Sequence, residues 1–337
     1  MAVLYIVGER PGVGATSIVA SLTQRWTRAG QRVVAVKPAS LSEEVPEAGL
    51  LDRLSTGSLS GPAVVVDPGM PDDALLDKAA ARVKALAEKA DVVIVEGLPR
   101  MTEDGSSVDS SPALAERIGA RVIGIARYQR SLDASSAAGW REAYASSLAG
   151  VVVNRRTRYG EHDAVSRLTP AFEGAGVSVV GVIPEERVLL APTVRQVVDL
   201  LDGTFYAGLS GESALIEHFI IGGLLTEGGA GYFERLPNQA VIARGGRMDI
   251  QMSALSFPLN CLLLTGCKEP PQYVYQRAVD LDVPLIVTDL DTHETATALE
   301  TLGERVSFDH PAKVDYLADR LDDVLDMSAM RSAAGLR

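Results

Sequence analysis

The sequence is poor in cysteine and in cations, and it lacks any long apolar run. Two cysteines among 337 residues exclude a disulfide framework and suit a reducing compartment. Lysine and arginine number 32 against 44 acidic residues, and the net charge of −12 argues against general nucleic-acid binding. No stretch reaches the roughly 18 uninterrupted apolar residues that a membrane span needs. We therefore expect a soluble cytoplasmic protein with neither nucleic acid nor membrane as a partner.

Apolar residues are plentiful and are organised in short runs. With 47% hydrophobic residues and 337 positions, the chain exceeds what one core usually organises, which predicts two domains. In the first part, strand-like runs rich in β-branched residues alternate with helix-like segments. The strand-like runs are residues 2–7, 32–37, 63–67, 91–97, 121–127, 150–154 and 177–186, with helices including 16–30 and 72–90. This pattern predicts a doubly wound, mainly parallel α/β domain over residues 1–200.

A second alternation of shorter elements begins after residue 205. Strand-like runs near 217–223, 238–246, 260–266 and 283–289 enclose helix-like segments at 247–256 and 270–282, and 292–303 follows them. These elements predict a smaller α/β domain over residues 201–327, which ends in an amphipathic helix at 311–327. We expect residues 328–337 to form a frayed terminal tail.

A glycine-rich loop follows the first strand and opens the first helix. It reads Gly8-Glu9-Arg10-Pro11-Gly12-Val13-Gly14-Ala15-Thr16-Ser17. Glycines let successive backbone amides face a phosphate, and the dipole of the following helix adds attraction for an anion. The loop matches the pattern GxxxGVGKT except at one position, where Ala15 replaces the lysine that neutralises charge on the β- and γ-phosphates. The loop therefore predicts a phosphate site that has lost its usual cation.

Other charged and polar residues come at strand ends where they can reach that loop. Arg10 and Lys37 are candidate replacement cations, although each also fits as an ordinary solvated charge. Glu96 and Thr16 are candidates for holding Mg²⁺. Asn154 can read a base edge through its amide, or serve as a turn residue. The ligand we expect is ATP or ADP with magnesium.

The motifs of the first part resemble a known family. VGERPGVGATS, VVAVKP, VIVEGL, GVVVN and GVIPEERVLLAPTVRQV are similar in order and spacing to the dethiobiotin-synthetase-like P-loop domain at the amino end of some phosphate acetyltransferases. The resemblance implies that Lys37 corresponds to the lysine of the synthetase KP motif. It also implies that Glu96 is the acidic magnesium residue and that Asn154 contacts the base.

The second part resembles the DRTGG domain that follows in those enzymes and that also occurs in regulated pyrophosphatases. ARGGRMDIQMSAL, LLLTGC and PLIVTDLDTHETA carry the resemblance, with Gly246 in place of the usual aspartate and Cys267 in place of a glycine. Arg247 is a candidate for gripping a phosphate or carboxylate, or else for a salt bridge with Asp249 or Asp289. The resemblance implies self-association, so a homo-oligomer is expected.

Three functions follow from these features. The first is a nucleotide-binding or regulatory protein with a degraded P-loop, which senses a small phosphorylated ligand or regulates a metabolic enzyme through its DRTGG domain. The second is an ATP-dependent ligase or carboxylase of the dethiobiotin synthetase type that uses Lys37 and Arg10. The third is a dimeric scaffold. No acetyltransferase domain follows residue 327 in this sequence, so we expect neither that activity nor competent ATP hydrolysis from this chain alone, and no residue is predicted to be catalytic.

The remaining candidate metal ligands do not form a recognisable motif. The four histidines are far apart, and neither cysteine lies at a metal-ligand spacing from another ligand. Asp289, Asp291 and Glu294 cluster near residue 290, where we interpret Asp291 or Thr292 as a helix cap rather than part of a cation site.

Overall fold

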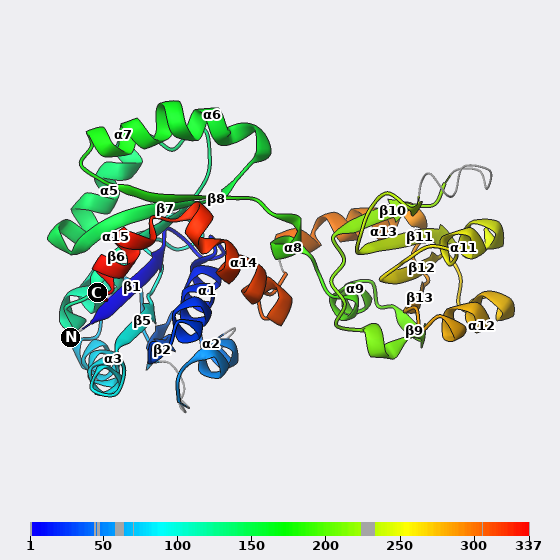
Figure 1. Ribbon diagram of the computed structural model, residues 1–337, viewed down its shortest axis with the longest axis horizontal. Coiled ribbons are helices and arrows are strands. Elements are labelled where there is room, and N and C mark those ends of the chain that lie inside the picture. The colour runs from blue at the N-terminus through cyan, green and yellow to red at the C-terminus, as the bar shows by residue number, and fades with distance from the viewer. Residues whose placement is uncertain are drawn as a thin grey trace. The chain divides into compact units, whose positions relative to one another are not determined.

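The computed structural model describes residues 2–43, 45, 48–57, 64–69, 71–223, 233–304 and 306–336. The chain divides into two units (Figure 1). Unit 1 comprises Met1–Glu185 and Phe308–Arg337, and unit 2 comprises Glu186–Ser307. In sequence, unit 2 is therefore inserted between the two parts of unit 1.

Unit 1 is built on a parallel sheet with strand order β2-β5-β1-β6-β7-β8. Its strands are β1 (Val3–Gly8), β2 (Val33–Val36), β5 (Val92–Glu96), β6 (Arg121–Arg127), β7 (Leu148–Arg156) and β8 (Val179–Pro184). The central strands β1 and β5 are buried along their whole length, because helices cover both faces. Unbroken apolar runs of this kind are what a doubly covered parallel strand requires. The predicted doubly wound sheet is confirmed.

Two sets of helices cover the faces of this sheet (Figure 1). One face packs against α3 (Asp73–Ala87), α4 (Ser110–Ile118), α5 (Ala134–Tyr144) and α7 (Thr169–Gly174). Helix α1 (Ala15–Arg28), with α2 (Ala48–Leu54) beside it, packs against β1, β2 and β5. Asp72 begins α3 by accepting from the amides of Ala74 and Leu75, which satisfies two of the donors left free at a helix start. A short helix, α6 (Glu161–Asp163), precedes α7 through one π-helical turn.

One strand predicted for the main sheet lies elsewhere. Within residues 63–67, Val64–Val65 forms β4, which pairs with β3 (Ala39–Ser40) in a separate two-stranded sheet. Val65 is 43% exposed, although its run has strong strand propensity, and residue 63 of the predicted run lies outside the described residues.

Unit 2 has a smaller mixed sheet with strand order β10-β11-β12-β13-β9. Its strands are β9 (Thr204–Ala207), β10 (His218–Ile221), β11 (Gln239–Arg244), β12 (Cys261–Thr265) and β13 (Leu285–Thr288). Four strands are parallel, and β9 pairs antiparallel with β13 at the edge. Helices α11 (Met248–Ala254) and α12 (Gln272–Asp280) cover one face, and α9 (Val194–Leu200) and α13 (Thr292–Glu300) cover the other. A four-residue helix, α8 (Arg187–Leu190), precedes α9. The predicted second α/β unit is confirmed.

The carboxyl-terminal segment differs from the prediction in two respects. Helix α14 (Pro311–Val324), assigned above to the second domain, belongs to unit 1, where it packs against α1. The expected frayed tail contains helix α15 (Met327–Ala333), whose residues Met330 and Ala333 are buried. Amphipathicity predicted α14 itself, but it does not say which core its apolar face joins.

Candidate functional site

The glycine-rich loop connects β1 to α1 in unit 1. Strand β1 ends at Gly8 and helix α1 begins at Ala15. Between them, Gly12 and Gly14 adopt left-handed φ angles of 74° and 96°, which side chains with a Cβ rarely adopt. Helix α1 has no side-chain cap and no acidic residue in its first turn. Free amides at a helix start suit an anion, and the phosphate site at this loop stays a prediction.

Asn154 at the end of β7 fastens the middle of this loop. Its Nδ2 donates to the Val13 carbonyl at 2.8 Å, and its Oδ1 accepts from the Arg155 amide at 2.8 Å. A Cβ on Gly14 would lie 2.3 Å from Asn154 Nδ2, so only glycine fits beside this amide. The contact with a base edge that the resemblance implies for Asn154 stays a prediction, since both ends of the amide already bond to backbone.

Glu96 is the centre of the polar cluster beside the loop. Its Oε1 accepts from Thr16 Oγ1 at 2.8 Å and lies 3.0 Å from Lys37 Nζ. The Glu96 side chain is only 7% exposed, and its Oε2 is buried without a partner among the described residues. The structure thus brings together three residues that the sequence singled out separately. Carboxylate and hydroxyl oxygens are the ligands that Mg²⁺ prefers, so Glu96 and Thr16 fit that ion.

Ala15, Ser17 and Arg10 are further residues of the loop. Ala15 and Ser17 are half-buried in the first turn of α1, and Ala15 offers no polar group where a lysine was expected. Arg10 is half-buried, and its Nε is buried without a partner in the described part of the chain. A cationic role for Arg10 toward a ligand stays a prediction.

Sequence reasoning missed Arg100, which follows β5 by four residues. Its amide donates to the Gly8 carbonyl and the Met101 amide donates to the Glu9 carbonyl, both at 2.8 Å. Its guanidinium lies 3.5 Å from the carboxylate of Glu9, inside the loop. The only signal in the sequence is an arginine shortly after Glu96, which no motif distinguishes from a surface charge.

In unit 2, the candidate Arg247 is paired within its own helix start. Its Nε and Nη2 bond the two oxygens of Asp249 at 2.9 and 2.8 Å, and this partner holds the pKa of Asp249 at about 2. The salt bridge with Asp249 was one of the two open interpretations, and a ligand role for Arg247 stays a prediction. Asp291 caps α13 in a capping box with Glu294, as interpreted from the sequence.

Cys267 fills the space beside the neighbouring strand end. A Cβ on Gly245 would lie 2.4 Å from Cys267 Cβ, so the cysteine side chain occupies the volume that a residue larger than glycine would need at position 245. Gly246, in contrast, faces open space. The two departures from the DRTGG pattern therefore leave the fold of this sheet edge intact.

Together, the parallel sheet, the glycine loop ahead of α1 and the acidic residue at the end of β5 define a P-loop NTPase-like fold. Comparison with known families agrees. A family model described as an AAA domain matches residues 2–193, and one described as a DRTGG domain matches residues 196–302. The first match covers more than half of the chain, so the chain belongs to this AAA-domain family, with a DRTGG domain behind it. The resemblance inferred from the motifs is confirmed.

Curated relatives over the whole chain are phosphate acetyltransferases. The enzyme of Pseudomonas putida is 24% identical over 99% of this chain and 52% of its own length. The enzyme of Deinococcus radiodurans is 25% identical, over 96% of this chain and 50% of its own length. The chain thus spans about half the length of the curated relatives it matches.

Two solved structures are among those with similarity to this chain, both at low sequence identity. The MinD cell division protein of Aquifex aeolicus covers 56% of this chain and 85% of its own, with 16% identity and a TM-score of 0.38. The CBS and DRTGG domains of the Clostridium perfringens pyrophosphatase regulatory region, complexed with diadenosine tetraphosphate, give 17% identity and a TM-score of 0.31. They cover 44% of this chain and 64% of theirs. Within the described ranges, no helix has the length and apolar character to cross a membrane.

Proposed function

We propose that this chain is a regulatory protein that binds ATP or ADP with magnesium at the loop of residues 8–17. The observation that carries the proposal is the convergence on Glu96. Thr16 and Lys37 share one oxygen of this buried carboxylate, and the other oxygen has no partner in the described part of the chain. A buried, half-satisfied carboxylate is costly unless something further binds it. Mg²⁺ at Glu96 and Thr16 supplies that missing interaction.

The phosphates are held by the loop amides and by cations outside position 15. Among the described residues no side chain caps the amides at the start of α1, and Lys37 reaches the same cluster from the end of β2. Magnesium supplies charge neutralisation for the phosphates when bound. Because Ala15 cannot reach the γ-phosphate, the site binds a nucleotide but hydrolyses it slowly or not at all.

The DRTGG unit gives this binding protein its regulatory part. We propose that it recognises a small phosphorylated ligand or a metabolic enzyme. The phosphate acetyltransferase relatives, matched over about half of their length, support an association with that kind of metabolism. A reaction that uses Lys37 and Arg10 is the alternative, and it requires measurable ATP turnover that depends on Lys37.

The test compares the wild type with Ala15→Lys, using ATP and ADP with and without Mg²⁺ in titration calorimetry. We expect the wild type to bind Mg·nucleotide, and Ala15→Lys to bind about tenfold or more tightly, because a charge-assisted hydrogen bond is added. Lys89→Met, an exposed lysine at the opposite end of β5, is the control and leaves the affinity unchanged. Absence of any heat in the wild type at millimolar nucleotide rejects the proposal.

A further inference from the structure

Arg100 lies between the phosphate loop and helix α5. Its Nη2 is 3.5 Å from Glu9 Oε1, and its guanidinium carbon is 5.1 Å from the centroid of the Trp140 ring. The side chains of Arg100 and Glu9 are only 18% and 10% exposed. A Cβ on Gly139 would lie 3.2 Å from Arg100 Nη1, so the guanidinium passes close over α5. Each of these two charges therefore has the other as a close neutralising partner.

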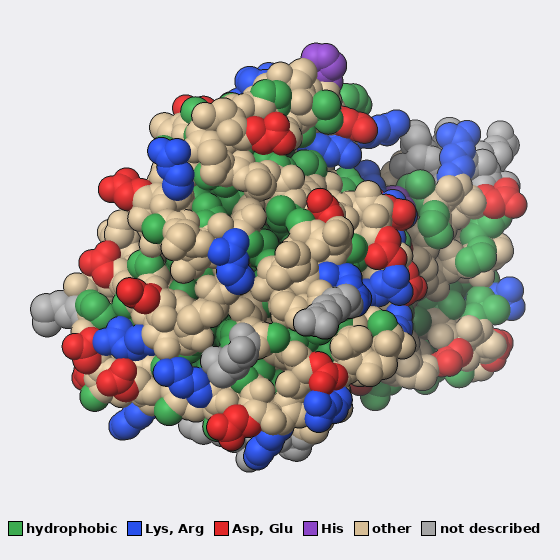
Figure 2. All heavy atoms as spheres, turned by 60° about the vertical axis from the view of Figure 1, so that its left-hand side comes forward, with side chains coloured by type: hydrophobic (Ala, Val, Ile, Leu, Met, Phe, Trp, Pro, Cys, Tyr) green, Lys and Arg blue, Asp and Glu red, His purple; other side chains and the backbone are tan. Residues whose placement is uncertain are grey.

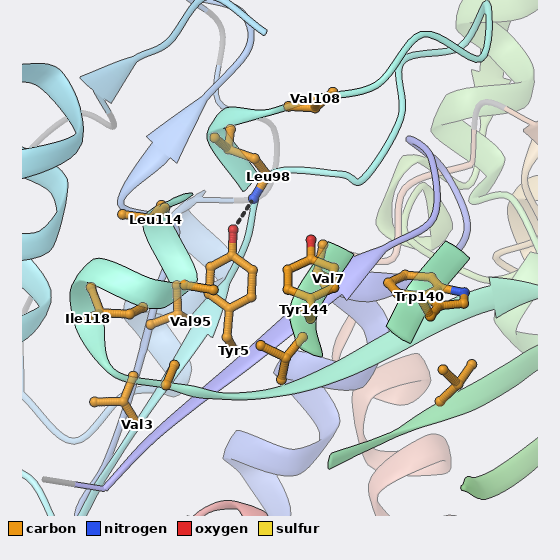
Figure 3. Close-up of a cluster of buried hydrophobic side chains, with 14 of the residues drawn as sticks. Val3, Tyr5, Val7, Val95, Leu98, Val108, Leu114, Ile118, Trp140 and Tyr144 are labelled. Atoms are coloured by element: carbon orange, nitrogen blue, oxygen red, sulfur yellow. Dashed lines mark hydrogen bonds between the residues drawn. The ribbon is translucent and has the colours of Figure 1, made fainter. Parts of the chain in front are cut away.

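A chain of contacts supports the Trp140 ring behind Arg100. The Trp140 ring stacks on Tyr144 at 6.0 Å, and Tyr144 Oη lies 2.8 Å from Ser111 Oγ. Ser111 Oγ donates to the Leu98 carbonyl at 2.6 Å, two residues before Arg100. Figure 3 shows the Tyr144 and Trp140 rings in the buried core. These contacts therefore lead from Arg100 through α5 and Ser111 back to Leu98, in the same segment as Arg100.

Tyr5 fixes the other side of that segment. The Leu98 amide donates to Tyr5 Oη at 3.1 Å, drawn as the dashed line in Figure 3. Burial raises the pKa of the Tyr5 and Tyr144 phenols, so both stay protonated and bonded at neutral pH. A Cβ on Gly97 would lie 2.1 Å from the Tyr5 ring, which leaves this segment no room to shift toward the core.

The same segment is joined to the phosphate loop through its backbone. The amides of Arg100 and Met101 donate to the carbonyls of Gly8 and Glu9. The segment begins directly after Glu96, the acidic residue of the polar cluster. Arg100 is therefore placed to fix the loop and Glu96 relative to each other.

A negative charge at Glu9 is unfavourable in this loop unless Arg100 is paired with it. A carboxylate in a loop that receives phosphate repels the ligand, and a buried carboxylate without a partner is strongly destabilising. The salt bridge to Arg100 offsets both penalties and at the same time holds the second residue of the loop.

We propose that Arg100 is a positioning residue of the phosphate loop. Held between Glu9 and Trp140, it sets the loop from Gly8 to Gly14 in the form that accepts a nucleoside polyphosphate. This assignment rests on the proposed function, because the form it maintains is the nucleotide-binding one. This role and a direct ligand role predict opposite effects of Glu9 on nucleotide affinity. In the positioning role, Glu9 strengthens nucleotide binding although it is negatively charged.

The test is a double-mutant cycle in the full chain on Mg·ATP affinity, with Glu9→Gln, Arg100→Met and both together. We expect each single variant to bind about tenfold more weakly and the double variant no more weakly than either, because one interaction is lost in all three. Arg100→Lys recovers part of the loss. Arg141→Met, on α5, where Nη1 of Arg141 donates to the Ala175 carbonyl, is the matched control and binds like the wild type. Tighter binding by Glu9→Gln, or additive losses, overturns the assignment.

Hydrogen exchange of the ligand-free proteins separates this proposal from the proposed function. We expect the amides of Glu9, Arg10 and Gly12–Gly14 to exchange faster in Glu9→Gln and Arg100→Met than in the wild type or Arg141→Met, at a temperature where all four are folded. If the wild type binds no nucleotide but this exchange pattern is found, the proposed function fails and the positioning role of Arg100 stands. Unchanged exchange in both variants overturns the positioning role of Arg100, whatever the result of the nucleotide titrations.

Discussion

Lys37 Nζ lies 3.0 Å from Glu96 Oε1, at the ends of β2 and β5, which are neighbours in the sheet. The parallel register brings the two side chains to the same edge as the glycine loop. A cation therefore lies beside the glycine loop although position 15 is alanine. The Lys37 side chain is 21% exposed, so its charge is screened less than it would be in water.

Replacing Lys37 with methionine should weaken Mg·ATP binding by about 10- to 100-fold, because a charge-assisted bond contributes roughly 1.5–3 kcal/mol. Methionine keeps most of the apolar stem, and Lys37→Arg should retain part of the affinity. Calorimetry measures both. The Lys89→Met control separates the site from a general loss of positive charge, and equal affinity of Lys37→Met and the wild type removes Lys37 from the site.

Gly12 and Gly14 should respond differently to asparagine, which tolerates a left-handed φ better than most residues. At Gly12 no atom lies within 4 Å of the added Cβ, whereas at Gly14 it meets Asn154 Nδ2 at 2.3 Å. We expect Gly12→Asn to retain nucleotide binding within a few-fold. Gly14→Asn should lose at least about tenfold, because Asn154 must release the Val13 carbonyl.

The same titrations decide this prediction, with thermal unfolding as a check that both variants fold. Equal losses at the two glycines show that backbone conformation alone matters. Adding Asn154→Ala to Gly14→Asn removes the clash but does not restore the bond to the Val13 carbonyl. The double variant should therefore not recover the affinity.

Much of the architecture was predictable from local patterns. Unbroken runs of β-branched residues predict buried parallel strands. The glycine loop, Lys37 and Glu96 can each be recognised in the sequence because they follow such a run or end it. The meeting of Thr16, Lys37 and Glu96 follows from the strand order, which places β1 and β2 on either side of β5.

Contacts that depend on tertiary placement were not predictable. The edge strand β9 is only four residues long, and β4 pairs outside the main sheet. Asn154 is recognisable as a residue after a strand, but its bond to Val13 spans 141 residues. Arg100 carries no motif, since its role depends on Glu9, Trp140 and their burial. On the face shown in Figure 2, basic and acidic side chains are intermixed, which offers no pattern that marks one arginine.

Acid should remove a stabilising contact around Asp163. Two bonds from Arg167 and one from the Tyr128 phenol hold the pKa of Asp163 at about 2, below its ordinary 3.8. A depressed carboxyl pKa stabilises the fold above about pH 4, and the contribution disappears as the pH falls toward 2. We therefore expect Asp163→Asn to lower the midpoint of thermal unfolding at pH 6 but not near pH 2.

Unfolding midpoints of the wild type and Asp163→Asn across pH 2–7 give the difference directly. Glu173→Gln, an exposed acid on α7, is the control and should show no pH-dependent gap. A gap that stays constant to pH 2 assigns the effect of Asp163→Asn to packing rather than to the ion pair with Arg167.

The last prediction concerns α14, which follows unit 2 in the chain but stabilises unit 1. Its buried face includes Val314, Leu317 and Leu321, and Arg28 of α1 bonds Asp315 and Asp319 at 2.6 and 3.0 Å. These pairs are well exposed and contribute little, so the apolar face carries the attachment. Leu321→Ala should therefore destabilise unit 1 by about 2–5 kcal/mol, and Arg28→Met by no more than about 1 kcal/mol. Hydrogen exchange should rise in β1 and α1 but not in β12, with Asp323→Ala as the exposed control on the same helix. Faster exchange in β12 alone would assign α14 to unit 2, which is where its position in the sequence had placed it.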